Sequence, residues 1–172
     1  RAGEYLRMDA ATRRNLEITE TLRGEPAPTL FSLLDECATG MGSRLLRHWL
    51  MHPQTDRQQA TLRHDAVAHW LDHGFEPLRD AMRQVSDVQR ITARIALRQA
   101  RPRELAGLRF TLDLLPALAA AAPIGTTLLD QLHRSLAPSP DIADALRAIA
   151  DEPAALLREG GVIAEGVDAE LD

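Results

Sequence analysis

The feature that most constrains this chain is an apolar pattern with helical period that recurs from segment to segment. In residues 41–50 the apolar side chains fall at offsets 0, 4, 5, 8 and 9, so they share one face of a helix. Pro53 follows and is expected to end that helix. Aromatic residues make up only 3% of the chain, while Leu, Ala and Arg dominate. Because these are strong helix formers, we expect a mainly α protein with an aliphatic core.

Start and stop signals place the other helices. Thr29 is expected to cap a short helix, and Pro102 and Ser139-Pro140 stand where helices begin. The glycines of residues 158–166 predict a short extended segment between helices. The longer helices are expected over residues 56–73, 76–84, 87–99, 102–122, 126–136 and 141–150. Their unequal lengths and spacing predict an irregular multi-helix core domain.

The two ends of the chain differ from this helical middle. Short apolar runs at residues 5–8 and 16–19 flank a polar stretch, which predicts a small β element, either a hairpin or a strand with a helical turn. Near the other end Asp168 is expected to cap a helix whose first turn is residues 169–171. That severed helix and the missing initiator Met favour a fragment of a longer protein.

Length and composition narrow the class of protein. The 172 residues fit one domain, and no apolar run reaches the roughly 18 residues that span a bilayer. The single Cys37 excludes an internal disulfide and fits a reducing compartment, so we expect a cytoplasmic protein. All 20 basic residues are Arg, yet the net charge is −5, whereas a non-specific DNA binder is normally basic.

The helix over residues 41–50 begins in a glycine-flanked turn, TGMGS, at residues 39–43. A phosphate-binding Walker loop also needs a Lys, and this chain has none, so the glycines are interpreted as a helix start. On this core helix we expect Leu45, Leu46, Trp49 and Leu50 to be buried. Loss of a buried Trp side chain costs about 3 to 5 kcal/mol.

Several residues have side chains that catalytic or metal sites use. His48 and His52, like His69 and His73, are spaced four apart, as a metal pair on a helix would be, or as histidines at helix ends and surfaces. Cys37 has no His or Asp partner nearby in sequence and is interpreted as a small buried thiol. We therefore predict no catalytic, metal or cofactor residue. A metal enzyme built on these residues is the alternative, and bound metal would reveal it.

Arg90, Arg94 and Arg98 form a stripe at four-residue spacing. Like charges at that spacing repel one another, so a partner is implied. The stripe is open to three interpretations: a solvated or internally paired face, a protein interface, or a contact with nucleic-acid phosphate. Residues 151–172 contain seven acidic residues and one Arg, so that end should repel DNA.

Five collinear segments resemble the MutS family of bacterial DNA mismatch repair proteins, in the helical core region called domain III or the lever. They are DAATRRNLEIT (9–19), TLFSLLDECATGMGSRLLRHWLMHP (29–53), RHDAVAHWL (63–71), VSDVQRITARIALRQARPRELAGLR (85–109) and REGGVIAEGVDAELD (158–172). The resemblance implies that residues 1–172 are a core fragment, truncated at the start of the long lever helix. The inserted clamp domain and the returning lever helix are then absent. Val167 departs from the family, which tends to have an aromatic residue there.

The resemblance also implies a function for the full-length protein. MutS proteins are dimers that clamp mismatched duplex DNA and hydrolyse ATP with Mg in a C-terminal domain. This chain has neither the mismatch-reading Phe-x-Glu motif nor a Walker motif, so no catalytic or cofactor residue is carried over. Its expected role is to couple mismatched-DNA engagement to the ATPase domain, through contacts with other MutS domains and a second subunit. A stand-alone helical protein-interaction module unrelated to DNA is the alternative.

Overall fold

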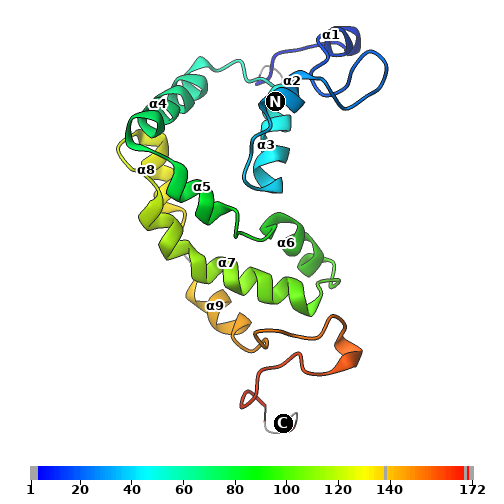
Figure 1. Ribbon diagram of the computed structural model, residues 1–172, viewed down its shortest axis with the longest axis vertical. Coiled ribbons are helices and arrows are strands. Elements are labelled where there is room, and N and C mark those ends of the chain that lie inside the picture. The colour runs from blue at the N-terminus through cyan, green and yellow to red at the C-terminus, as the bar shows by residue number, and fades with distance from the viewer. Residues whose placement is uncertain (1–3, 138, 169, 171–172) are drawn as a thin grey trace. The chain divides into compact units, whose positions relative to one another are not determined.

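The computed structural model describes residues 4–137, 139–168 and 170 of the chain. The chain divides into two compact units, Arg1–His69 and Trp70–Asp172, which we call the N-terminal unit and the C-terminal unit. The boundary between them falls within the helix α4 (Figure 1). No helix in the described ranges combines the length and the apolar character needed to cross a membrane.

Capping side chains set the helix starts of the N-terminal unit. Asp9 begins α1 by accepting a hydrogen bond from the Thr12 N–H at 2.6 Å. Thr29 and Ser32 form a capping box at α2, as the sequence predicts for Thr29. The helices are α1 (Ala10–Asn15), α2 (Leu30–Leu34), α3 (Gly40–Met51) and α4 (Arg57–His73).

Little of the N-terminal unit is fully buried. Ile18, Thr29 and Ala66 are its buried side chains among the described residues. The backbone of Ile18 also ties the loop after α1 to α2, because its carbonyl accepts the Phe31 N–H at 2.8 Å. Hydrogen bonds of this kind hold the unit together where apolar burial is scarce.

The β element expected near the N-terminus does not form as a hairpin or a strand. Tyr5 pairs with Gln54 in an isolated antiparallel bridge, flanked by a 2.8 Å hydrogen bond from the Leu6 N–H to the Pro53 carbonyl. The polar stretch between the two apolar runs is α1 instead. Asp9 caps that stretch, so local helix formation prevails over pairing of the runs.

In the C-terminal unit, α7 is the longest helix and packs against α5, α6 and α9 (Figure 1). Its core joins Ile91, Leu108 and Leu146 from α6, α7 and α9, all less than 10% exposed. This is the aliphatic core that the composition predicts. The elements are α5 (Glu76–Met82), α6 (Val88–Ala96), α7 (Pro102–Ala121), α8 (Thr127–Arg134), α9 (Pro140–Leu146) and a 3-10 turn η1 (Leu157–Glu159).

The helix α9 ends at Leu146, whereas the sequence predicts a helix to residue 150. The reason is a non-local contact, an isolated antiparallel bridge between Ile149 and Ile163. The Ala150 N–H donates to the Val162 carbonyl at 2.9 Å, so this backbone is not available to continue the helix. The extended segment predicted over residues 158–166 thus binds the backbone that follows α9 and ends this helix.

At the end of the described chain, an Asp168 carboxylate oxygen accepts the Glu170 N–H at 3.0 Å. This contact is compatible with the capping role expected for Asp168. Ala169 and Leu171, which the sequence places in the first turn of a lever helix, lie outside the described residues. The start of that helix therefore stays a prediction.

Candidate functional site

The glycine-flanked turn before α3 is built as a helix start. Thr39 accepts the Gly42 N–H at 3.0 Å. A Cβ at Gly42 would lie 3.3 Å from the Thr39 hydroxyl and 3.4 Å from the Cβ of Cys37, so glycine permits a close approach here. Ser43 donates its hydroxyl to Asp35 at 2.5 Å, and this hydrogen bond lowers the pKa of that carboxyl. Both side chains that could meet a phosphate are thus engaged within the chain.

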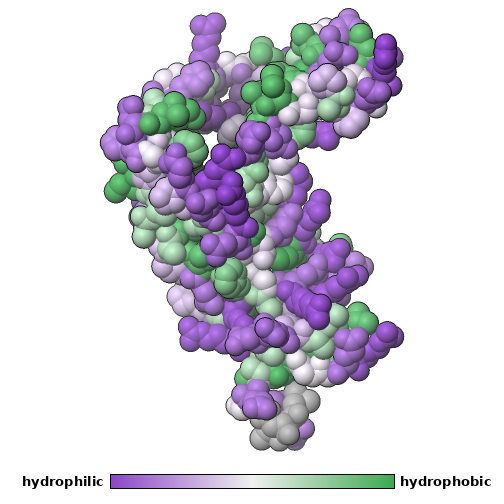
Figure 2. All heavy atoms as spheres, viewed as in Figure 1, coloured by the Kyte–Doolittle hydropathy of each residue, from purple (hydrophilic) through white to green (hydrophobic). Residues whose placement is uncertain are grey.

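The apolar face of α3 is not the buried face that the sequence predicts. Leu45 is 48% exposed and Trp49 38% exposed, while Leu46 and Leu50 are half-buried. The helix α2 packs on α3 within this unit, but it has only five residues and leaves Leu45 and Trp49 exposed. Figure 2 shows hydrophobic residues at the molecular surface in several places. Periodicity identified the face correctly, but the N-terminal unit does not cover it.

Two arginines stack on aromatic rings around α3. The guanidinium of Arg63 lies 3.8 Å from the centre of the Trp49 ring, and that of Arg47 lies 5.9 Å from the centre of the Phe31 ring. Such cation–π contacts contribute about 0.5 to 1 kcal/mol at exposed sites. Trp49 is therefore held by an arginine from α4 rather than by a closed core.

The histidines of α3 form an aromatic cluster. The rings of His48 and His52 stack with centroids 4.6 Å apart, and Tyr5 meets both edge-on, at 6.4 and 6.0 Å. His52 is the C-cap residue of α3, as expected for a histidine at a helix end. Within the described ranges, no three His, Cys, Asp or Glu side chains come together to hold a metal ion. The cluster therefore joins the N-terminal segment to α3 by ring contacts.

Cys37 is exposed, contrary to the buried thiol that the sequence predicts. It lies in the loop between α2 and α3, where its backbone N–H is 3.4 Å from an Asp35 carboxylate oxygen. Because loops of this kind run over the surface, the small apolar character of the thiol does not by itself bury it.

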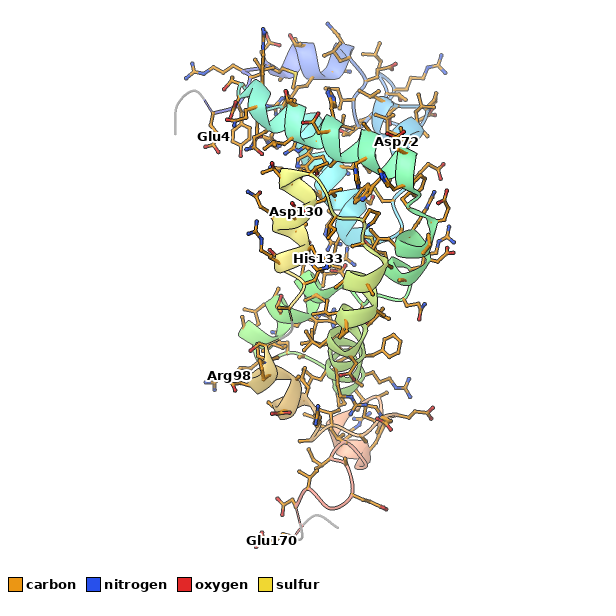
Figure 3. All side chains as sticks on the ribbon, turned by 90° about the vertical axis from the view of Figure 1, so that its left-hand side faces the viewer. Glu4, Asp72, Arg98, Asp130, His133 and Glu170 are labelled. Carbon is orange, nitrogen blue, oxygen red and sulfur yellow. The ribbon has the colours of Figure 1, made fainter. Side chains whose placement is uncertain are left out.

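The arginine stripe of α6 is shorter than predicted. Arg98 lies beyond the end of the helix with φ +55°, and the Arg98 and Gln99 N–H groups close the last turn on the Ile95 and Arg94 carbonyls. This is a Schellman ending with Arg in the position that glycine usually occupies. The Arg98 side chain extends away from the ribbon in Figure 3. Four-residue spacing therefore fails to place Arg98 on the same face as Arg90.

The two arginines that remain on α6 have acidic partners in the chain. Arg94 contacts Glu104 of α7 at 2.7 Å, and Arg90 lies 3.5 Å from Asp87 at the start of its own helix. Both arginines are largely exposed, so each pair contributes little to stability. These pairs favour the internally paired interpretation for Arg90 and Arg94. A contact of the three arginines with phosphate or a protein stays a prediction.

A more deeply placed arginine on α7 fastens the segment after α9. Arg109, whose side chain is 15% exposed, donates to the Ile149 carbonyl and lies 2.5 Å from the Asp151 carboxylate. Arg103, six residues earlier on the same helix, donates to the Pro153 carbonyl at 3.4 Å. The sequence analysis did not predict these contacts, because each arginine and its partner are at least 40 positions apart in the sequence. No local signal in the sequence marks such pairs.

Comparison with known protein families identifies the family to which this chain is similar. The family model described as MutS domain III matches residues 11–171 of the chain. The match extends over both units and includes α3, α6 and α7. The resemblance carried by the five sequence segments is thereby confirmed.

Proposed function

Because the chain belongs to the MutS domain III family, we propose that it acts as a structural core and lever segment of a mismatch repair protein. In this role it couples engagement of mismatched DNA to the ATPase domain. The observation that carries the proposal is the family match over residues 11–171. Domain III is the non-catalytic core of MutS proteins, and the ATPase lies elsewhere in the full-length protein.

The C-terminal unit has the physical properties that such coupling requires. Energetic coupling across a protein is carried by packed side chains and rigid elements. The 20-residue helix α7 is about 30 Å long at the usual rise per residue, and it packs on α5, α6 and α9. Pro116 lies inside this helix, where it removes a backbone hydrogen bond, so the stiffness that coupling requires comes from the packing of α7 on its three neighbours rather than from the helix alone.

The partners follow from the proposed role. In the full-length protein they are mismatched duplex DNA, a second MutS subunit and the other MutS domains, while ATP and Mg bind outside this segment. Within the segment we assign no catalytic, metal or cofactor residue. Cytoplasmic localisation is part of the same proposal.

A pair of variants in the full-length protein tests the coupling. Leu108→Ala removes a buried side chain of α7, whereas Phe110→Ala removes one that is 51% exposed on the same helix. We expect Leu108→Ala to reduce the stimulation of ATP turnover by mismatched DNA at least threefold while DNA-free turnover is retained. Phe110→Ala should leave the stimulation unchanged. Equal stimulation in Leu108→Ala and the parent protein would contradict the proposal.

DNA binding by the isolated chain separates this role from direct DNA reading. We expect no mismatch preference when labelled matched and mismatched duplexes are titrated in fluorescence anisotropy. Weak, mismatch-blind binding with a steep salt dependence, lost on substitution of Arg90, Arg94 and Arg98 by Gln, would assign those arginines to phosphates. A preference for the mismatched duplex would contradict the proposal, because it would mean that this segment itself reads the mismatch. If the segment were instead an interaction module unrelated to DNA, neither α7 variant would change the stimulation of ATP turnover by mismatched DNA.

A further inference from the structure

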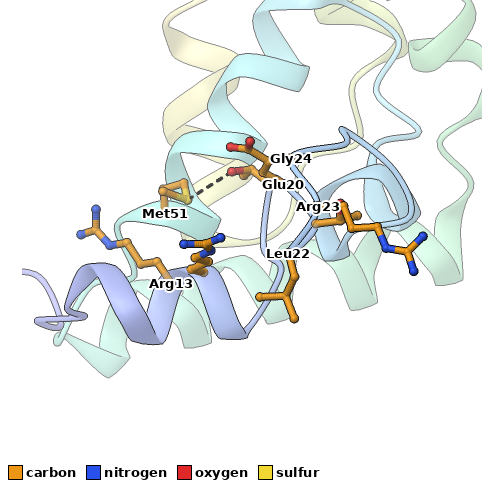
Figure 4. A pocket seen from close by; sticks show the side chains of 9 residues that line it. Arg13, Glu20, Leu22, Arg23, Gly24 and Met51 are labelled. Atoms are coloured by element: carbon orange, nitrogen blue, oxygen red, sulfur yellow. Dashed lines mark hydrogen bonds between the residues drawn. The ribbon is translucent and has the colours of Figure 1, made fainter.

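The N-terminal unit contains a pocket of about 510 Å³ between α1, the loop after it and the end of α3 (Figure 4). One wall carries two neighbouring arginines from the last turn of α1, Arg13 and Arg14. Leu22 and Met51 are its apolar side chains, and the Thr19 hydroxyl donates to the Met51 sulfur at 3.8 Å. The pocket is of the size that accommodates small organic ligands.

One of the two arginines has a buried donor without a protein acceptor. Nε of Arg13 is buried and has no hydrogen-bond partner. No hydrogen bond or ion pair within the described ranges joins the Arg13 or Arg14 side chain to a carboxylate. Glu17, the acidic residue nearest to them in sequence, accepts the Leu22 N–H at 2.7 Å instead. Because this buried Nε has almost no accessible surface, a ligand in the pocket would contact the terminal nitrogens of the two guanidinium groups instead.

The loop that faces the arginines is fixed before any ligand arrives. Thr21 exchanges backbone hydrogen bonds with Glu25 and Gly24, and its hydroxyl also accepts the Glu25 N–H at 3.0 Å. Gly24 has φ +82°, a conformation that glycine adopts without strain. Binding to such a preformed site requires little ordering of the chain.

The charges of the lining select the class of ligand. Arg13, Arg14 and Arg23 are the basic residues of the lining, and the Arg23 side chain points away from Met51 in Figure 4. Glu20 is the one carboxylate among the lining residues. Two guanidinium groups suit a phosphate, and a carboxylate accepts hydrogen bonds from hydroxyl groups. We propose that this pocket binds a small phosphate monoester that carries hydroxyl groups, with Arg13 and Arg14 on the phosphate and Glu20 on a hydroxyl.

Calorimetric titration of the 172-residue chain with ribose 5-phosphate tests this site. We expect saturable binding that the double variant Arg13→Gln, Arg14→Gln weakens at least tenfold. Arg47→Gln, which removes an arginine outside the pocket, should leave the affinity unchanged. Circular dichroism establishes that each variant is folded. Binding that is unchanged in the double variant, or absent from the parent chain, would overturn the proposal.

Two further variants test the pocket independently of the arginines. Leu22→Glu places a carboxylate at a lining position that is 54% exposed, so it should abolish binding without unfolding the chain. Glu20→Gln should lower the affinity for ribose 5-phosphate relative to that for inorganic phosphate. Equal ratios in Glu20→Gln and the parent chain would contradict the assignment of the hydroxyl contact. Binding of duplex DNA through Arg13 and Arg14, without binding of ribose 5-phosphate, would overturn the small-ligand assignment.

Discussion

The two units of this chain are held together by different interactions. In the C-terminal unit, Ile91, Leu108 and Leu146 form a continuous aliphatic core from three helices. In the N-terminal unit, backbone hydrogen bonds between segments, ring contacts of Tyr5 and cation–π pairs join the elements, and Leu45 and Trp49 remain exposed. A helix as apolar on one face as α3 therefore does not make a core unless enough neighbouring elements cover it.

The difference also bears on the proposed roles. A closed aliphatic core resists deformation, which suits the coupling proposed for α7. Exposed apolar side chains do not separate the units, because Leu45 and Trp49 are exposed in the N-terminal unit and Leu97 and Phe110 in the C-terminal unit. The units differ in that the C-terminal unit joins buried side chains of three helices in one core.

The largest expected effect is at the core of the C-terminal unit. Leu108→Ala should lower the free energy of unfolding by about 2 to 5 kcal/mol, because it leaves a cavity between α6, α7 and α9. Leu45→Ala in the N-terminal unit removes a side chain that is already 48% exposed and should cost about 1 kcal/mol or less. Chemical denaturation measures both changes. Equal losses would remove the contrast between the units.

A smaller loss is expected when the segment after α9 is released from α7. Arg109→Gln should destabilise the C-terminal unit by about 1 to 3 kcal/mol, because the Ile149 carbonyl loses a charged donor. Asp151 is 96% exposed, so Asp151→Asn should change the stability by less than about 0.5 kcal/mol. Hydrogen exchange of the Ala150 amide reports the release directly. Unchanged protection of this amide in Arg109→Gln would show that the bridge between Ile149 and Ile163 holds the segment in place without Arg109.

The contact between Arg63 and Trp49 is expected to stabilise the N-terminal unit, in which Trp49 is not buried. A double-mutant cycle with Arg63→Gln and Trp49→Leu should give a coupling energy of about 0.5 to 1 kcal/mol. The loss for Trp49→Ala should then fall below the 3 to 5 kcal/mol typical of a buried Trp. A loss in that higher range would mean that the ring is buried in solution. Tryptophan fluorescence would detect this as a blue shift.

The smallest effect concerns pH. The hydrogen bond from Ser43 holds the pKa of Asp35 below its ordinary value of about 3.9. Its stabilising contribution is therefore complete above that ordinary value and is lost as the pH falls through the lower pKa of the folded state. Ser43→Ala should raise the pKa of Asp35 toward the ordinary value. NMR titration of the carboxyl group measures the change. An unaltered pKa would show that the Cys37 N–H or other groups keep the pKa of Asp35 low without Ser43.

Much of the fold was predictable because helix signals are local. The cap at Thr29, the proline at the start of α7 and the length of α4 follow from residues within a few positions of one another. The α6 helix was predicted too long, because Arg98 adopts a left-handed conformation usually reserved for glycine. The α9 helix was predicted too long because a distant segment binds the backbone of Ala150.

The candidate site was less predictable, since it depends on which segments meet. The stripe at Arg90, Arg94 and Arg98 was inferred from spacing, and spacing says nothing of Glu104 or of the turn at Arg98. The adjacent arginines at positions 13 and 14 were visible in the sequence only as part of a family segment. Their pocket requires the loop after α1 and the end of α3.

By itself, the sequence determined the helical class, most helix starts and membership of the MutS domain III family. These properties rest on periodicity, caps and motif order, which act over one or two helical turns. Only the tertiary structure decided that Leu108 is buried while Leu45 is exposed, and that Arg109 binds a carbonyl 40 residues away. Burial and long-range pairing depend on the neighbours that each element acquires in space, and no local pattern encodes those neighbours.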